Sequence, residues 1–193
     1  MDDLDSSLLN ELLDAVGAHL EEAGESASIV VVGGSTLAVR GWVDRTTKDV
    51  DVIAQSIRSD GERTLVPASP LPDALVRAAL RVAEDYGLPV DWMNTVIGAQ
   101  WAFGLPPGFA AEVEWRDYGS LEVGFAGRSS LIALKLFAVV DSGIESVHFQ
   151  DLLALEPTAD ELTEAETWVL GQDAGTQFPR LLKEALSDVR RSL

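Results

Sequence analysis

The chain has 193 residues, and 47% of them are hydrophobic, which suits one large or two small globular domains with a sizeable core. It contains no cysteine, so disulfides, thiolate catalysis and cysteine-based zinc sites are excluded. The two histidines, His19 and His148, stand alone in the sequence and do not favour a histidine-based metal site. We expect His148 to be structural.

The formal net charge is −18, and it is concentrated at the two ends of the chain. Residues 1–25 include 8 acidic and no basic residues, and residues 141–193 include 11 acidic and 4 basic ones. This acidity favours solubility and argues against broad electrostatic binding to nucleic acid, so no DNA partner is expected. A local basic pocket remains compatible with it.

Nothing in the sequence predicts a membrane protein or an exported one. No apolar run reaches the roughly 18 residues of a membrane span. The N-terminus is acidic, whereas a signal peptide begins with basic residues. We therefore expect a cytoplasmic protein without a membrane partner.

In chain order, the first half of the sequence predicts helices alternating with short strands. Apolar residues at helical spacing predict an amphipathic helix over residues 6–23. A buried strand over 28–32, a short helix over 34–40, a loop over 41–48 and a strand over 49–54 follow. Polar residues with Gly61, Pro67 and Pro70 predict a loop over 56–69, and the next helix, over 73–86, ends at Gly87.

The second half predicts a few more strands and then only helices. A third strand over 90–93 precedes a short helix or turn over 96–103, and alternating residues predict a hairpin of 112–116 with 120–125. Helices are expected over 129–140, 145–155, 158–172 and 177–193, with Thr158 and Glu161 as a capping box. The prediction is thus a mixed α/β core over 1–127 and a helical C-terminal subdomain over 128–193, packed on that core.

The segment from Val30 to Ala54 contains two motifs with chemical potential. Gly33-Gly34-Ser35 follows the first strand, where glycines let the backbone approach a phosphate closely; an ordinary turn is the alternative. Asp49-Val50-Asp51 lies on the next strand, where alternation points both carboxylates to one side. Such a pair can hold divalent metal against a triphosphate. The alternative is a pair of ordinary surface carboxylates on an edge strand.

The spacing of about 14 residues between the two motifs resembles that of the nucleotidyltransferase superfamily, which shares the DNA polymerase β palm. The segment Arg45-Thr46-Thr47-Lys48-Asp49-Val50-Asp51 is similar to a form found in AbiEii-like toxin nucleotidyltransferases and in related uncharacterised families. Residues 90–94, 130–136 and 151–155 also match segments of such relatives, so the resemblance covers about residues 29–168.

The resemblance implies a palm-like mixed sheet and Mg²⁺-dependent transfer of a nucleotidyl group from an NTP. Asp49 and Asp51 would hold two metal ions, with a third carboxylate from a later strand. The phosphates would lie against Gly33, Gly34 and Ser35, and the nucleotide would also contact Arg45, Thr47 and Lys48. The acceptor implied is tRNA or a protein, and the chain would be a toxin paired with an antitoxin.

Three further groups of residues have more than one interpretation. Asp91 is favoured as the third carboxylate because it follows the family order, and Glu112 and Glu114, on one strand face, compete with it. Arg40, Arg45 and Lys48 either neutralise a triphosphate or form a solvated loop. Asn94 and Trp92 are candidates to contact a base, although core packing is the safer interpretation of Trp92.

Lys135 interrupts the apolar helix over 129–140, where it either reaches the helix edge as a snorkelling lysine or neutralises triphosphate oxygens. In the relatives, a helix with a lysine precedes a helix with an aspartate, which matches Lys135 and Asp151. Asp151 would pair with this lysine or hold it in place; a solvated helix position is the alternative.

Two other functions remain open from the sequence. The chain could keep the nucleotidyltransferase fold and bind nucleotide without turnover. It could also be an interaction protein whose acidic helices dock on a basic partner, in which case replacing Asp49 and Asp51 by alanine would leave its activity in cells unchanged.

Overall fold

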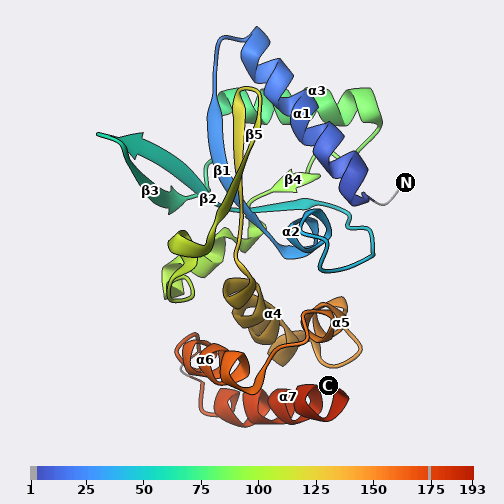
Figure 1. Cartoon of the computed structure of the whole chain (residues 1–193), viewed down its shortest axis with the longest axis vertical. Helices are drawn as coiled ribbons and strands as arrows, with labels where there is room; N and C mark the ends of the chain where they lie inside the picture. Colours follow the sequence, from blue (N-terminus) through green and yellow to red (C-terminus); the bar gives the residue numbers. More distant parts are fainter. Residues whose placement is uncertain (1–3, 174) are drawn as a thin grey trace. The chain divides into compact units, whose positions relative to one another are not determined.

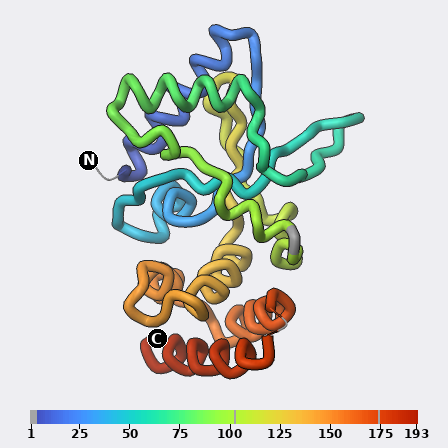
Figure 2. Tube along the Cα trace, turned by 180° about the vertical axis from the view of Figure 1, so that it is seen from behind, coloured from blue at the N-terminus to red at the C-terminus, as the bar shows by residue number. Residues whose placement is uncertain are grey.

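The computed structural model describes residues 4–173 and 175–193 and divides the chain into two compact units. The first unit comprises residues 1–101 and 113–126, and the second comprises residues 102–112 and 127–193. Figure 1 labels most of the elements of both units, and Figure 2 follows the same chain from the opposite side.

A mixed sheet is the frame of the first unit, which confirms the predicted mixed α/β class. Its order is β3-β2-β1-β6-β5, and β4 also pairs with β2. The β1–β6 and β2–β4 pairs are parallel, and the others are antiparallel. Within the described residues the strands are β1 Ala27–Val32, β2 Val50–Ser59, β3 Glu62–Pro67, β4 Met93–Asn94, β5 Glu114–Tyr118 and β6 Leu121–Phe125.

Helices α1 (Ser6–Glu22) and α3 (Asp73–Tyr86) lie side by side on one face of this sheet (Figure 1). Their apolar stripes share a core with alternate residues of β1, β2 and β6, because alternate strand residues point to the same face. The Asp5 carboxylate caps α1 by accepting a hydrogen bond from the Leu8 amide at 2.8 Å. The apolar spacing of the first helix and the end of the second at Gly87 were both predicted, and both helices are confirmed.

The loop predicted over residues 56–69 is wrong, because most of this segment is a hairpin. Strand β2 continues to Ser59 and pairs with β3 across the two-residue turn Asp60-Gly61. Both turn residues have positive φ, 53° and 84°, as the tight turn between twisted antiparallel strands requires. The polar side chains that suggested a loop belong to strands with solvent-exposed positions, and the Asp-Gly pair was the overlooked signal.

Three other strand boundaries differ from the prediction. Strand β2 begins at Val50, so Asp49 immediately precedes it. Strand β4 is only Met93–Asn94, and Asp91 lies in the turn before it. The predicted hairpin is formed by β5 and β6 with its turn at Gly119-Ser120, whereas Glu112 is helical.

Four helices form most of the second unit, as the sequence predicts: α4 Arg128–Ser142, α5 Val147–Ala154, α6 Ala159–Leu170 and α7 Phe178–Ser192. The others all contact α4, which is buried along most of its length. The predicted capping box at the start of α6 is confirmed, with Thr158 and Glu161 bonded reciprocally. No helix of the described residues has the length and apolar character needed to cross a membrane.

The second unit also includes a segment that the sequence placed in the first. Residues 102–112 end in the 3₁₀ helix η2 (Phe109–Glu112), which contacts α4. A Cβ built on Gly127 would lie 2.3 Å from the Cβ of Glu112, so the two chain segments touch where a larger residue would collide. This association depends on contacts between distant residues, which local sequence patterns do not reveal.

Candidate functional site

The predicted glycine turn and the predicted carboxylate pair meet in the first unit. Strand β1 ends at Val32, and the chain turns at Gly33, with φ of +75°, into the short helix α2 (Gly33–Val39). The register of β1 with β2 pairs Val32 with Asp51. A Cβ built on Gly33 would lie 2.4 Å from Oδ2 of Asp51, so this carboxylate occupies space that only a glycine leaves open.

The loop before β2 lies against the second glycine. A Cβ on Gly34 would lie 2.7 Å from Oγ1 of Thr47 and 3.1 Å from Nη2 of Arg45. Two backbone hydrogen bonds between Thr47 and Leu4, of 2.7 and 2.9 Å, anchor the loop. The Arg45 guanidinium also donates to the carbonyl of Thr46 at 2.7 Å. Arg45 and Thr47 are therefore held beside the glycine turn, as their predicted role requires.

Asn94 is the third polar side chain beside Asp49 and Asp51. The parallel register of β2 and β4 pairs it with Asp51, so their side chains share a face of the sheet. Its Nδ2 contacts Oδ2 of Asp49 at 3.4 Å, and its Oδ1 accepts a hydrogen bond from the Val96 amide. The two aspartates and Asn94 therefore gather at the first residues of β2, which is flanked by β1 and β4 and is not an edge strand there.

Of the three predicted third carboxylates, Asp91 and Glu114 belong to the first unit with this pair and Glu112 belongs to the second, and which of them would complete a metal site stays a prediction. Asp91 is exposed in its turn, and within residues 4–173 and 175–193 no group of three or more histidine, aspartate or glutamate side chains could hold a metal ion. Glu112 and Glu114 do not share a strand face, because Glu112 is in η2 and β5 begins at Glu114. Glu114 is bound by Arg40 at 2.5 Å and by Arg116 at 2.9 Å.

The remaining predicted residues of the first unit differ in what they offer a ligand. Ser35 is buried, and its hydroxyl donates to the carbonyl of Val32 at 3.2 Å. Arg40 is held by Glu114, whereas Lys48 is exposed, with no ion pair found in the described part of the chain. Trp92 is a core residue, 1% exposed, whose indole donates to the carbonyl of Ala79, which confirms its structural interpretation.

Lys135 and Asp151 form a buried ion pair in the second unit. Nζ of Lys135 lies 2.7 Å from Oδ2 of Asp151, and the side chains are only 7% and 1% exposed. Lys135 is therefore not a snorkelling lysine at the helix edge, and Asp151 is not at a solvated helix position, so both of these interpretations are wrong. The pair joins α4 to α5, and its place in one site with Asp49 and Asp51 stays a prediction.

The donors at the start of β2 suit a hard divalent cation. The two carboxylates offer oxygen ligands, the type that Mg²⁺ prefers, whereas Asn94 turns its Nδ2 toward Asp49 and its Oδ1 toward the Val96 amide. The role of Asn94 follows from the parallel pairing of β2 with a two-residue strand. The sequence predicts a strand over 90–93 but not its pairing with β2, so Asn94 is expected from the sequence only as a candidate base contact.

Comparisons of the chain with family models, with curated proteins and with solved structures find no match.

Proposed function

We propose that this protein transfers a nucleotidyl group from an NTP to a hydroxyl acceptor, with Mg²⁺ as its cofactor. The observation that supports this best is the meeting of Asp51 with the Gly33 turn, next to Asp49 and Asn94. A glycine turn at the start of a helix suits binding of phosphate groups, and two neighbouring carboxylates suit the metal ions that accompany them. The palm-like assignment of the sheet belongs to this proposal.

In the reaction, the acceptor oxygen forms a bond to the α-phosphorus of the NTP. The bond from that phosphorus to the bridging oxygen breaks, pyrophosphate leaves with the electron pair, and the acceptor proton passes to water. When bound by Asp49 and Asp51, Mg²⁺ would neutralise phosphate oxygens and lower the pKa of the acceptor hydroxyl. The triphosphate would lie against the backbone of Gly33, Gly34 and Ser35, and Arg45, Thr47 and Lys48 would contact it.

The sequence resemblance alone implies a catalytic role for Lys135, which would be to neutralise charge on the transferring phosphate, with Asp151 as its partner. An acceptor such as tRNA or a protein, and pairing with an antitoxin, follow from the sequence resemblance alone. The acidic ends of the chain disfavour RNA bound by charge over a wide surface, so an RNA acceptor would have to be recognised locally.

The test is label transfer from each α-labelled NTP, with Mg²⁺ and an extract of total RNA and protein. We expect labelled acceptor with the wild type, and a loss of about 100-fold or more with Asp49→Asn. Asp44→Asn is the matched control, because Asp44 is an exposed carboxylate of the same loop. Transfer should also stop in EDTA. If no NTP labels any acceptor, or if both variants lose activity equally, the transferase proposal is wrong.

A non-catalytic nucleotide-binding protein is the second candidate. The observation that favours it is Asn94, a neutral amide that donates to Asp49 and is paired in register with Asp51. It predicts that NTP and Mg²⁺ bind to the wild type more tightly than to Asp49→Asn, while no pyrophosphate is released with any acceptor. Measured binding together with measured turnover would exclude it.

A further inference from the structure

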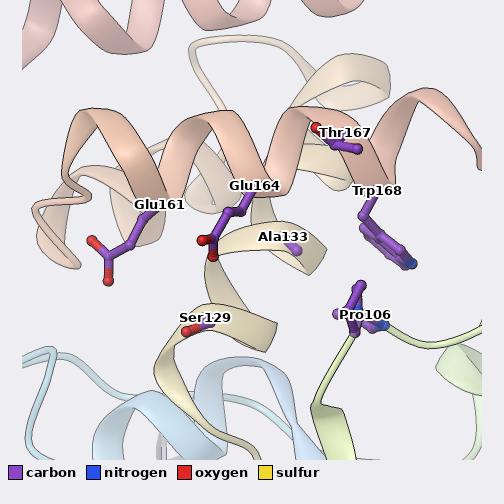
Figure 3. A pocket seen from close by; sticks show the side chains of 9 residues that line it. Pro106, Ser129, Ala133, Glu161, Glu164, Thr167 and Trp168 are labelled. Carbon is purple, nitrogen blue, oxygen red and sulfur yellow. The ribbon is translucent and has the colours of Figure 1, made fainter.

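The second unit contains a pocket of about 250 Å³ between α4, α6 and the Pro106-Pro107 segment. Figure 3 shows side chains of α6 pointing toward α4 and Pro106 across this space. All of its lining residues belong to the second unit, and none belongs to the site at β2.

The walls of the pocket are largely apolar and are held in place by packing. Pro106, Ala133, Ala165 and Trp168 line it, and each is buried, Trp168 with 9% of its surface exposed. The Trp168 ring packs edge-on against Phe137, with ring centroids 6.2 Å apart. An aromatic ring fixed in this way offers its surface to a ligand with little loss of side-chain entropy.

The charged groups that line the pocket are both acidic, beside the hydroxyls of Ser129 and Thr167, and only one of the two carboxylates is neutralised. Arg128 donates to both oxygens of Glu161 and holds the pKa of that carboxyl below its usual range, so Glu161 stays charged and paired. Glu164 has no ion pair or side-chain hydrogen bond within the described residues of the chain. It lies one helical turn before Trp168, and both side chains project from the same side of α6 (Figure 3).

We propose that this pocket binds an organic cation with an alkyl stem, an ammonium or a guanidinium group. The stem would pack on Ala133, Ala165 and Pro106, and the charged head would lie between the Glu164 carboxylate and the Trp168 ring. A carboxylate with a neighbouring indole attracts cations both by charge and through the electron-rich ring face. The acidity of residues 141–193, with 11 acidic and 4 basic residues, adds a favourable field.

The size of the pocket limits what it accepts. Its volume is below the roughly 300–1,000 Å³ of pockets that enclose drug-sized ligands, so it suits a single side chain or a short amine. Organic cations of this kind occur in two forms: as an arginine or lysine side chain of a partner chain, and as a free polyamine. The probes are chosen to separate these sources from each other and from purely apolar binding.

The experiment titrates the full chain, without nucleotide, with N-acetylarginine amide, with its neutral near-isostere N-acetylcitrulline amide, and with spermidine. The readout is the indole N–H signal of Trp168 in an NMR spectrum, assigned with Trp168→Phe. We expect this signal to shift with the arginine amide or with spermidine and not with the citrulline amide. A response to the arginine amide alone indicates a partner side chain, and a response to spermidine alone indicates a free amine.

Two glutamate variants of α6 test whether Glu164 is responsible. Glu164→Gln should weaken the cation about 10-fold or more, as expected for loss of a charge-assisted hydrogen bond. Glu166→Gln is the matched control, because Glu166 is on the same helix, does not line the pocket and pairs with Arg190. The proposal is overturned if no cation shifts the signal below about 10 mM, if the citrulline amide binds equally well, or if both variants weaken binding alike.

Discussion

The Asp51 carboxylate lies in the space that a side chain at Gly33 would need, with Oδ2 2.4 Å from a Cβ built there. The glycine turn and the aspartate pair are separate motifs in the sequence, but they are in contact in the fold. The contact arises because the antiparallel register of β1 and β2 pairs Val32 with Asp51. A substitution on either side of this contact would disturb the other, because neither the turn nor the strand can move without breaking backbone pairing.

Gly33→Ala should therefore destabilise the protein more than backbone strain alone explains. Gly41 is the control: its φ of +69° is close to the +75° of Gly33, but a Cβ there would meet nothing within 4 Å. Gly41→Ala should cost about 1 kcal/mol, the usual strain of a left-handed residue, and Gly33→Ala about 1–3 kcal/mol more. Urea unfolding of both variants measures the difference, and equal costs would show that Asp51 can move aside freely.

Asn94→Asp should make folding stability depend on Mg²⁺. The variant places a third carboxylate beside Asp49 and Asp51, so without divalent metal repulsion should lower the free energy of unfolding by about 1 kcal/mol. Excess Mg²⁺ should remove this loss by binding the folded state. Thermal unfolding with Mg²⁺ and with EDTA provides the measurement, and Asn94→Ala is the uncharged control. A loss that Mg²⁺ does not reverse would contradict the metal site.

Variants of the buried Lys135–Asp151 pair can separate its contribution to folding stability from its contribution to catalysis. Lys135→Met alone should cost about 3–5 kcal/mol, because it leaves the Asp151 carboxylate, 1% exposed, without its partner. Adding Asp151→Leu should restore most of this stability, since an apolar pair of similar size can replace a buried ion pair. Denaturant unfolding of the single and double variants tests both expectations.

The same double variant tests the catalytic role of Lys135. If Lys135 neutralises phosphate charge, the folded double variant should remain inactive in the label-transfer assay while its unfolding midpoint is close to that of the wild type. Full activity in the double variant would show that the pair only stabilises the second unit.

Glu122 should give the protein a stability that is lost in acid. Arg63 donates to both carboxylate oxygens, at 2.8 and 2.6 Å, and together with Ser28 and Arg58 lowers the pKa of Glu122 from 4.5 to about 2. A depressed folded-state pKa contributes stability above pH 4.5 that disappears as the pH falls to about 2. Solvent screening of this partly exposed cluster limits the contribution to about 1–2 kcal/mol.

Glu122→Gln isolates this contribution. Unfolding by urea at about pH 5 and about pH 3 should show a smaller loss of stability on acidification for the variant than for the wild type. Glu114→Gln serves as a comparison, since Glu114 lies on the same sheet as Glu122 and is also paired with arginines. An identical pH dependence in Glu122→Gln and in the wild type would mean that Glu122 has no depressed pKa.

Helices were the most predictable part of this protein, because their signals are local. The apolar residues of α1 and α4, the Gly87 stop of α3, and the capping pair Thr158 and Glu161 are each local to one element. The hairpin of β2 and β3 was missed because its strands have exposed polar residues, although Asp60-Gly61 was visible in the sequence.

The candidate site was predictable only in part, for a related reason. The glycine turn and the two aspartates have recognisable residue types, but Asn94 reaches them through a strand of two residues that no periodicity marks. The burial of Lys135 with Asp151 also depends on how α4 and α5 pack, since sequence alone allowed both an exposed and a buried lysine. Pairing between distant segments decides these positions.

The assignment of residues 102–112 to the helical unit has a consequence for synthesis of the chain. The polypeptide passes from one unit to the other three times, after Trp101, after Glu112 and after Ala126. On the ribosome, the Pro106-Pro107 segment therefore emerges before the helices it packs with, and strand β6, which joins β1 to β5, emerges after it. Neither unit is complete when its first segment leaves the ribosome: the first unit is complete once residues 113–126 are made, whereas residues 102–112 must wait for the C-terminal helices.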